Sequence, residues 1–373
     1  MMDWGGMKSK VSIVKCKDYE RIKVEQAVKK AFDLLGGINA FVKKGERVLI
    51  KPNILSARLP EDGVCTHLEV IRAVVRLVKG CGAVVFIGDN PGGSISPAMA
   101  YKGSGLISLA KEEGVEFKEV KGIKIVNSIP IAAYVFECDK IINLPKMKTH
   151  TLMGLTGAVK NMYGACAGLH KTELHKKFPN PEEFAKILVD TFEIARPSLV
   201  LVDGIVSMDQ AGPSSGRLRN SGILIAGEDS VAIDAVFAGL VGIKPLDVLS
   251  TKEAYKRKLG EADLENIEIL GGSVKENLIN DFEVPGKSGL IAALGPLAKF
   301  AAKFIKFEPH INKKLCKKCM ICRDSCPVLA IAISPDKSVI DLKKCIRCMC
   351  CHEVCPHKAI ELKRNFLARR LGL

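Results

Sequence analysis

Eight cysteines near the C-terminal end of the chain lie in two runs with the same spacing. The sequence reads CKKCMICRDSCP from Cys316 and CIRCMCCHEVCP from Cys345, so the pattern C-x-x-C-x-x-C-x-x-x-C-P occurs twice. Three cysteines at this spacing can bind three corners of one [4Fe-4S] cluster, and the fourth, which precedes proline, ligates the other cluster. The pattern therefore predicts two [4Fe-4S] clusters with crossed ligand sets: Cys316, Cys319, Cys322 and Cys355 for one, and Cys345, Cys348, Cys351 and Cys326 for the other.

Zinc binding and disulfide formation are the alternatives for these cysteines. A zinc site usually takes two C-x-x-C pairs separated by a longer loop, which would leave the third and fourth cysteines of each run without a role. The spacing therefore favours the clusters. Cys350 lies between two predicted ligands but has no place in the pattern, and we interpret it as a thiol packed near a cluster.

This segment, about residues 308 to 362, resembles the bacterial-type ferredoxins with two [4Fe-4S] clusters. Between the runs, VLAIAISPDKSVIDL is typical of two short strands around a Pro-Asp-Lys turn, and HKAIEL after Pro356 repeats the turn and strand. The resemblance implies a duplicated half-module and one-electron transfer at low potential.

The remaining composition indicates a reducing compartment and no membrane span. Every apolar run is shorter than the roughly 18 residues that a membrane helix needs, and MMDWGGMKSKVSIVKC at the N-terminus lacks the apolar core of a cleaved signal peptide. Beside the eight predicted ligands, the other cysteines among the 14 are scattered without paired spacing. We therefore expect a cytoplasmic protein of an anaerobic cell.

Much of the net charge of +15 is in the cysteine-rich region. Residues 308 to 373 hold 14 Lys and Arg against 6 Asp and Glu. A basic surface steers acidic partners toward it, so we expect a redox partner such as an acidic ferredoxin or flavodoxin. Nucleic acid is the competing partner, but aromatic residues make up only 5% of the chain and no recognition motif accompanies the lysines. We expect no nucleic-acid binding.

Residues 7 to about 285 alternate apolar runs with helical patterns. KVSIVK, RVLIKP, AVVFIG, KIINLP, LVLVDG and GILIAG are expected strands, and YERIKVEQAVKKAFDLLGG, LEVIRAVVRLVKGCG and LISLAKEEG are expected helices. Strands that are apolar throughout are typical of a mostly parallel sheet with helices on both faces. We predict an α/β domain over 7–285 and a small α+β ferredoxin-like module over 308–373.

Residues 286–307, GKSGLIAALGPLAKFAAKFIKF, connect the two predicted parts. The stretch is strongly apolar and carries Lys299, Lys303 and Lys306 on one side. The pattern fits an amphipathic helix on a membrane surface or a linker helix that packs against the α/β domain. Gly295 and Pro296 interrupt the apolar face, so we favour the linker.

Polar residues follow the apolar runs, and in open parallel sheets ligands bind at the carboxyl ends of the strands. We expect these ends to share one edge of the sheet and to form a binding site. The candidates at the ends are Lys51, Asn53, Asp89, Asn90, Asn143, Lys146, Lys148, His150, Asp203 and Asp209.

The stretch PKMKTH carries the most specific hypothesis. Lys146, Lys148 and His150 alternate, so on an extended segment they point to the same side, where they would bind the carboxylate or phosphate of a small anionic substrate. Lys160 and Asn161 on a following helix would close this pocket, and Lys51 and Asn53 would contribute to it.

In this hypothesis His150 moves a proton, because its unperturbed pKa lies near neutrality. Asp89 and Asp203 supply carboxylates for proton transfer or for holding a metal. The competing interpretation makes the lysines solvated and the aspartates turn formers or helix caps.

Three histidines are weaker candidates. His67 precedes an expected helix with Thr66 as its N-cap, and Cys65 with His67 is too small a set for a metal site. His170 and His175 are five residues apart, a spacing that does not place both on one helical face.

Several of these pieces together resemble the domain-of-unknown-function family 362, over about residues 45 to 245. They are IKPNIL, GVCTHLEVIRAVVRLVKGCGA, FIGDNPGG, INLPKMKTHTLMGLTGAVKNMYG, LVDGIVSMDQAGPSSGRL and IAGEDSVAIDAV. The resemblance implies that many members carry a C-terminal ferredoxin module and that the strand ends are motif positions, but it implies no reaction. Leu68 departs from the proline expected there.

Two functions remain open on the sequence alone. In one, the protein is an oxidoreductase whose clusters exchange single electrons with a small anionic substrate or cofactor in the α/β domain. In the other, it is an electron carrier or assembly adaptor whose large domain binds a partner protein and catalyses nothing. We favour the enzyme, because polar groups that converge at strand ends are how α/β folds usually build ligand sites.

Overall fold

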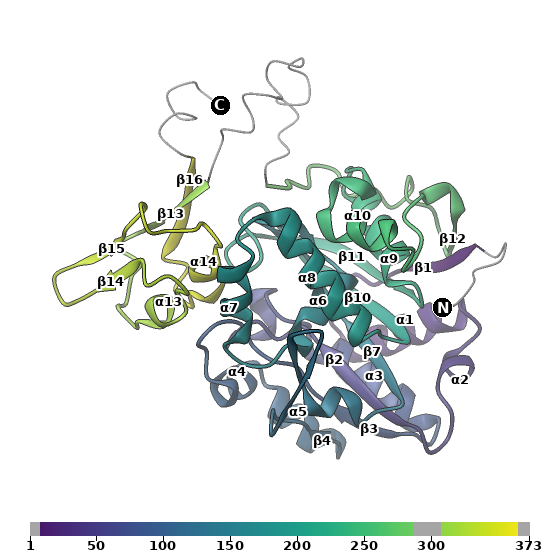
Figure 1. Ribbon diagram of the computed structural model, residues 1–373. Helices are drawn as coiled ribbons and strands as arrows, with labels where there is room; N and C mark the ends of the chain where they lie inside the picture. Colours follow the sequence, from purple (N-terminus) through teal and green to yellow (C-terminus); the bar gives the residue numbers. More distant parts are fainter. Residues whose placement is uncertain (1–7, 286–306, 365–373) are drawn as a thin grey trace.

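The structure of the chain, a computed structural model, describes residues 8–285 and 307–364. Figure 1 shows a large α/β body and, beside it, a smaller module that contains the two cysteine runs. Apart from Phe307, the predicted linker helix lies outside the described residues.

The α/β body is built on one mixed sheet. Its strands are β1 Ser9–Lys15, β2 Arg47–Pro52, β3 Val84–Ile87, β4 Glu116–Phe117, β7 Lys140–Leu144, β8 Lys146–His150, β9 Gly154–Thr156, β10 Leu199–Asp209, β11 Arg217–Gly227 and β12 Ile267–Leu270. The order is β12-β1-β11-β10-β7-β2-β3-β4, with β8 beside β10 and β9 beside β8. Along this order only the two pairs that involve β11 are antiparallel. The prediction of a mostly parallel sheet is confirmed.

Both faces of the sheet are buried, which is why its strands read as continuous apolar runs. In β2, Leu49 packs into the core on one face while its neighbours Val48 and Ile50 pack into the core on the other. Neighbouring residues of β10 divide in the same way, with Val200 on one side and Leu201 on the other. The helices complete both cores.

One face is covered by α1 Arg21–Asp33, α2 Ile38–Phe41, α3 Leu68–Gly80, α4 Pro97–Gly103 and α5 Leu106–Glu113. The other is covered by α6 Ala158–Asn161, α7 His170–Lys177, α8 Pro181–Ile194, α9 Ser230–Leu240 and α10 Leu249–Lys256. A separate hairpin consists of β5 Ile123–Val126 and β6 Ile129–Ala132.

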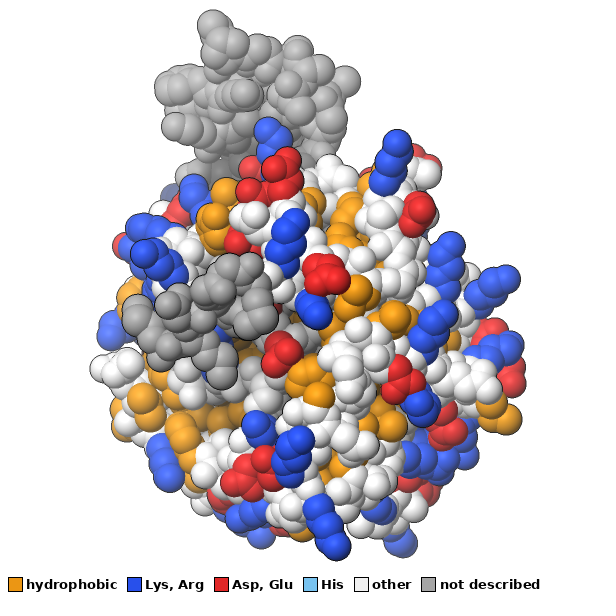
Figure 2. Space-filling model, turned by 90° about the vertical axis from the view of Figure 1, so that its right-hand side faces the viewer, with side chains coloured by type: hydrophobic (Ala, Val, Ile, Leu, Met, Phe, Trp, Pro, Cys, Tyr) orange, Lys and Arg blue, Asp and Glu red, His pale blue; other side chains and the backbone are white. Residues whose placement is uncertain are grey.

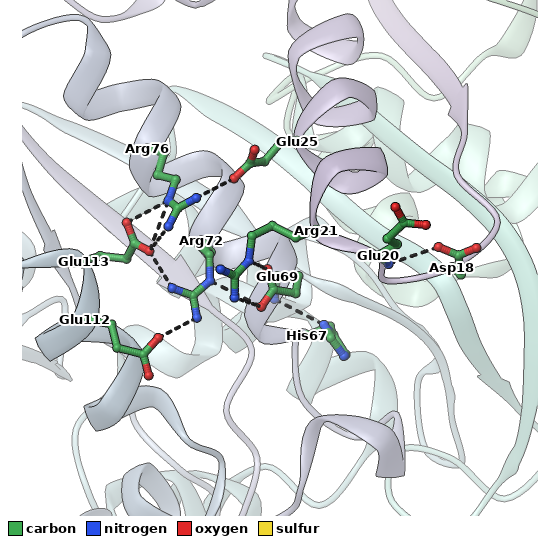
Figure 3. A network of polar contacts seen from close by, with 10 residues as sticks. All are labelled: Asp18, Glu20, Arg21, Glu25, His67, Glu69, Arg72, Arg76, Glu112 and Glu113. Atoms are coloured by element: carbon green, nitrogen blue, oxygen red, sulfur yellow. Dashed lines mark hydrogen bonds and ion pairs between the residues drawn. The ribbon is translucent and has the colours of Figure 1, made fainter.

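Charged side chains join α3 to α5 and α1 (Figure 3). Arg72 of α3 is buried and contacts Glu113 of α5 at 2.5 Å and Glu112 at 2.9 Å. Arg76, one turn later, contacts Glu113 at 2.9 Å and Glu25 of α1 at 2.8 Å. A buried guanidinium needs such partners, so this network holds the helices of one layer together.

Two local predictions are wrong. The N-cap of α3 is His67, whose Nδ1 accepts the N–H of Glu69 at 3.2 Å, and not Thr66, whose hydroxyl donates to the carbonyl oxygen of Leu144 at 2.6 Å. Asp203 does not end a strand: β10 continues to Asp209 because it pairs with β11 beyond that point.

The cysteine-rich module has two-fold internal similarity. Its elements are β13 Phe307–Ile311, α13 Ile321–Asp324, β14 Ile331–Ile333, β15 Ser338–Ile340, α14 Cys350–Val354 and β16 Ile360–Arg364. β14 pairs with β15 around the Pro-Asp-Lys turn, as predicted. β16 contains the end of the predicted strand HKAIEL and pairs with β13, a strand that we did not predict from the sequence. Positive φ angles recur at Lys318 and Met320 in the first run and at the equivalent Arg347 and Met349 in the second. The backbone is therefore wrapped in the same way in both halves.

Figure 2 shows the face of the α/β body that lies away from this module, where basic and acidic side chains are interspersed. Within residues 8–285 and 307–364, no helix is long and apolar enough to cross a membrane.

Candidate functional site

The ends of β2, β3 and β7 meet at one edge of the sheet, and several predicted site residues come together there. Lys51 is buried; its Nζ lies 2.7 Å from Asp89 Oδ1 and donates to the carbonyl oxygen of Asn161 at 2.6 Å. The Asn161 amide donates to Asn143 Oδ1 at 2.7 Å. Burial lowers the pKa of Lys51, and the Asp89 carboxylate opposes that shift. Lys51 and Asp89 therefore form a buried ion pair at the floor of the site.

Lys148 lies beside this pair but has no carboxylate within 4 Å among the described residues. Its Nζ donates to Asn53 Oδ1 at 2.8 Å and to the carbonyl oxygen of Val64 at 2.6 Å. The Asn53 amide donates to Asn161 Oδ1 at 2.8 Å. Burial, with a smaller effect from Lys160, lowers the pKa of Lys148 to about 7. The Lys148 ammonium is therefore bound by neutral oxygens, of the Asn53 amide and the Val64 carbonyl, and not by a carboxylate of the described residues.

Lys146 and Asp203 take no part in this group, contrary to the prediction of a single pocket. Lys146 Nζ lies 2.8 Å from Asp203 Oδ2 and 2.6 Å from the Tyr19 hydroxyl, which donates to Asp203 Oδ1 at 2.8 Å. The Tyr19 ring stacks on His67 at 3.6 Å. All the charges of this cluster are satisfied internally, because a completely buried ammonium requires a counter-ion. Lys146 and Asp203 therefore join β8 to β10 and to the segment before α1.

His150 at the end of β8 faces the cysteine-rich module. Its Nδ1 accepts the backbone N–H groups of Leu152 and Met153, both at 3.2 Å, which assigns the ring proton to Nε2. That Nε2 lies 2.9 Å from Glu353 Oε1 of α14, although the two are not aligned as a hydrogen bond. Burial lowers the pKa of His150 to about 4, so the ring is neutral at pH 7. The contact spans the two parts of the molecule.

A cavity of about 80 Å³ lies between the strand ends and α14. Of the predicted site residues, the cavity wall contains only Asn53, Asp89, Asn90, Lys160 and Asn161. Lys51, Lys146, Lys148, His150 and Asp203 do not line it. The wall is completed by residues that the sequence did not single out for the site, among them Tyr163, Lys171, His175, Cys350 and Glu353.

Lys171 is the most informative of the residues that sequence reasoning missed. Its buried ammonium donates to the carbonyl oxygens of Asn90 at 2.6 Å and Pro91 at 3.1 Å, and it has no carboxylate within 4 Å among the described residues. Burial lowers the pKa of Lys171 to about 8. In sequence Lys171 is one of three lysines in the polar segment HKTELHKK. Nothing in that segment shows which of the three is buried, so the sequence could not have identified it.

Two more groups give the cavity its charge. Burial lowers the pKa of Lys160, whose ammonium has no hydrogen-bond or ion-pair partner within the described residues. Burial raises the pKa of Glu353, but His150 and Lys160 outweigh that effect and hold it below its usual range. Burial lowers the pKa of His175 to about 4, which makes the ring neutral. Apart from the Lys51–Asp89 pair, two ammonium groups, Lys160 and Lys171, and one carboxylate, Glu353, therefore border the space and leave one positive charge in excess.

The cysteine-rich module contacts the α/β body around this cavity. Arg58 donates to the carbonyl oxygen of Cys355 at 3.1 Å, and the Ser94 hydroxyl lies 2.7 Å from that of Ser325. A Cβ on Gly93 would lie 2.6 Å from Ser325 Oγ, so glycine is needed for this close approach. On the other side His352 Nε2 lies 3.0 Å from the carbonyl oxygen of Ala211.

The cysteines of the module lie close to one another, and the crossed assignment of the ligands stays a prediction. The pKa of Cys322 is raised to about 12 by burial and then by the nearby thiols of Cys355, Cys319 and Cys316. Burial raises the pKa of Cys351 well above its usual range, with smaller effects from Cys348, Cys345, Cys322 and Cys326 in that order.

The donor set fits iron–sulfur clusters. The N–H groups of Ala330, Arg347 and Ala359 donate to the sulfur atoms of Cys326, Cys345 and Cys355 at 3.3, 3.4 and 3.2 Å, the kind of contact that tunes a cluster.

Fold and site together define an α/β domain joined to a small iron–sulfur module. The family model described as "4Fe-4S dicluster domain" matches residues 308–356, and such a domain transfers electrons. The model described as "Domain of unknown function (DUF362)" matches residues 48–239, so the chain belongs to this family.

The proteins that the chain is similar to include a relative and a solved structure. The thylakoid-associated protein sll1697 of Synechocystis sp. is 30% identical over 249 residues, which is 65% of this chain and 77% of that protein. The lactate racemase apoprotein from Thermoanaerobacterium thermosaccharolyticum has 15% identity and a TM-score of 0.37, over 61% of this chain and 56% of that chain. That score is too low to define a shared fold.

Proposed function

We propose that this protein is an oxidoreductase in which two [4Fe-4S] clusters exchange single electrons with a small anion bound in the cavity. The observation that carries the proposal is the shared cavity wall. Cys350 and Glu353 of α14 line the cavity together with Asn53, Asp89 and Lys171 of the α/β body. Because α14 also contains the predicted ligand Cys351, the electron-transfer module lies next to the space where a ligand would bind.

The charge around the cavity supports an anion. Lys171 and Lys160 both reach the wall, where Glu353 can balance only one of their two charges, and a bound carboxylate or phosphate would supply the missing counter-charge. The volume of about 80 Å³ holds roughly five water molecules. A substrate of two to four carbons, or the phosphate of a larger one that extends outward, fits this size.

The residues around the cavity would then have different roles in binding the anion and in proton transfer. Lys160 and Lys171 bind the anion, and the amides of Asn53 and Asn161 orient it. Asp89 stays charged beside Lys51 and keeps the floor of the site polar. Lys171, with a pKa of about 8, is the wall residue best able to give a proton near neutral pH. His150 takes a positioning role through Glu353.

The test is anion binding by anaerobically purified protein, measured calorimetrically with acetate, pyruvate and inorganic phosphate. Replacing Lys171 by Met should weaken binding at least about tenfold, because a hydrogen bond to a charged group contributes roughly 1.5–3 kcal/mol. Lys176→Met, an exposed lysine on the same helix, is the matched control and should leave affinity unchanged. If the unaltered protein binds none of these anions, the anion site is wrong and the adaptor function gains support.

We also propose an acidic redox protein such as a ferredoxin or flavodoxin as the electron donor or acceptor, in the cytoplasm. The excess of Lys and Arg in residues 308–373 supports this choice.

A further inference from the structure

The two halves of the cysteine-rich module have the same backbone but opposite environments. Cys319, the second cysteine of the first run, is exposed, whereas the equivalent Cys348 of the second run is buried. The following residues differ in the same way, since Met320 is 38% exposed and Met349 is 5% exposed. Both halves contact the α/β body, the first through Ile321 and Ser325, but the loop that carries Cys319 and Met320 is open to solvent whereas its equivalent in the second half is buried.

The buried half is the one next to the cavity. Cys350 is buried between Cys348 and Cys351, and it lines the cavity with Glu353. Among the cysteines of the first run none lines it; their loop instead lies in an exposed stretch from Lys313 to Met320, in which only Cys316 is partly covered. An electron that travels between solvent and the cavity thus meets the first run before the second.

The exposed loop is also basic. Lys313, Lys314 and Lys317 are exposed and have no ion-pair partner among the described residues. In the second run the position equivalent to Lys317 is Ile346, and Arg347 is paired with Glu308 at 2.9 Å. Lys343 and Lys344 of the second run are also exposed, so the larger share of the unpaired positive charge, three lysines against two, lies around the half whose cysteine is open to solvent.

We propose that the loop 313–320 is the docking surface for an acidic electron-carrier protein and that the first-run ligand set is the entry point for electrons. A reduced carrier gives up one electron, which passes through the first-run ligand set, then the second-run set, and then to the anion in the cavity. Two such transfers and protons from the site would complete a two-electron reduction. The destination of the electrons rests on the proposed function, but the docking surface does not.

The two ligand sets lie side by side. Cys322 of the first-run set and Cys351 of the second-run set belong to one buried cluster of side chains. The helices that carry them, α13 and α14, pack against each other.

The test uses a small acidic plant-type [2Fe-2S] ferredoxin as the probe and measures its binding to the full-length protein calorimetrically at low and high salt. Charge reversal by Lys314→Glu with Lys317→Glu should weaken binding at least about tenfold at low salt, and the difference should shrink at high salt because exposed charges are screened. The matched control is Lys343→Glu with Lys344→Glu, two exposed lysines at the start of the second run. The control should change affinity by less than about twofold.

A second measurement separates docking from damage to the clusters. Reduction by the methyl viologen radical cation, which needs no protein docking surface, should not slow in either double variant, and iron content should stay unchanged. Equal weakening in both variants, or weakening only in Lys343→Glu with Lys344→Glu, would overturn the proposed entry face. Loss of anion binding in Lys171→Met is independent of these results, so the two proposals can fail separately.

Discussion

At the residue scale, the site is defined by ammonium groups that lack carboxylates. Lys51 and Lys146 have carboxylate partners, as buried lysines usually require, whereas Lys148 and Lys171 are held by neutral oxygens. An unpaired buried charge is costly, and a protein retains it where a ligand supplies the partner. This is why we assign the binding site to the cavity and not to the Lys146–Asp203 cluster.

Lys171 predicts how anion binding depends on pH. Burial lowers the pKa of this cavity lysine to about 8, so its ammonium loses its charge over a range in which ordinary lysines keep it. Anion affinity should be highest below pH 7 and should fall as pH rises through about 8. Binding near pH 8 should take up protons, which calorimetry in buffers of different ionisation enthalpy measures.

The matched control for this pH profile is Lys171→Met, in which the fall above pH 7 should become shallower. A profile that is flat from pH 6 to pH 9 in the unaltered protein would contradict the role of Lys171 in binding the anion.

At the element scale, the loop after β3 and helix α14 form one contact that closes the cavity. Gly93 adopts a φ of +57°, and a Cβ there would lie 2.7 Å from Val354 Cγ1. Its neighbour Gly92 and the following Ser94 also contact the module. The cavity therefore depends on the contact between this loop and α14.

We predict that Gly93→Val separates the module from the loop and weakens anion binding at least about tenfold while iron content stays unchanged. The control is Gly114→Val, at a φ of +61° with no atom within 4 Å of its Cβ. Both substitutions carry a left-handed backbone cost of about 1–2 kcal/mol, but only the first meets α14. Equal anion affinity in the two variants would show that the contact does not shape the cavity.

The crossed cysteine runs give a prediction at the same scale. Because Cys326 follows the first run but lies with the ligands of the second, Cys326→Ala should damage the second-run cluster. Electron paramagnetic resonance of the reduced protein should then show the first-run signal intact. Selective loss of the first-run signal would argue for uncrossed ligand sets.

At the scale of the whole molecule, the chain places a charged, electron-transferring module against the edge of the α/β sheet at which the strand ends border the cavity. Direct contacts on two sides, through Ser94 and through His352, hold the two parts together around the cavity. Such an arrangement suits an enzyme in which chemistry and electron supply share one wall.

Cluster content tests the module as a whole. Anaerobically prepared protein should contain about eight iron and about eight sulfide per chain. About four iron, or one zinc per cysteine run, would remove the basis for electron transfer between the two ligand sets.

The sequence alone predicted the cluster module, because three of the four ligands of each cluster lie on one short loop. Their spacing in the sequence therefore decides whether they can bind one cluster. The sequence also determined the α/β class, since strands buried on both faces must be apolar throughout and β2 and β10 show that pattern. It placed Lys51, Asp89 and Asn161 at one site, because parallel strands end on the same edge.

Only the tertiary structure decided which polar residues face the cavity. Alternation along β8 could not reveal that Lys146 is neutralised by Asp203, since that pairing depends on β8 lying beside β10 in the sheet. Nor could it reveal Lys171 and Glu353, which reach the cavity from α7 and α14 and come from segments about 180 residues apart. The repeat in the cysteine runs is symmetric in sequence, and only packing against the α/β body makes Cys319 exposed and Cys348 buried. Ligand spacing is local, whereas burial and charge pairing depend on contacts between distant segments.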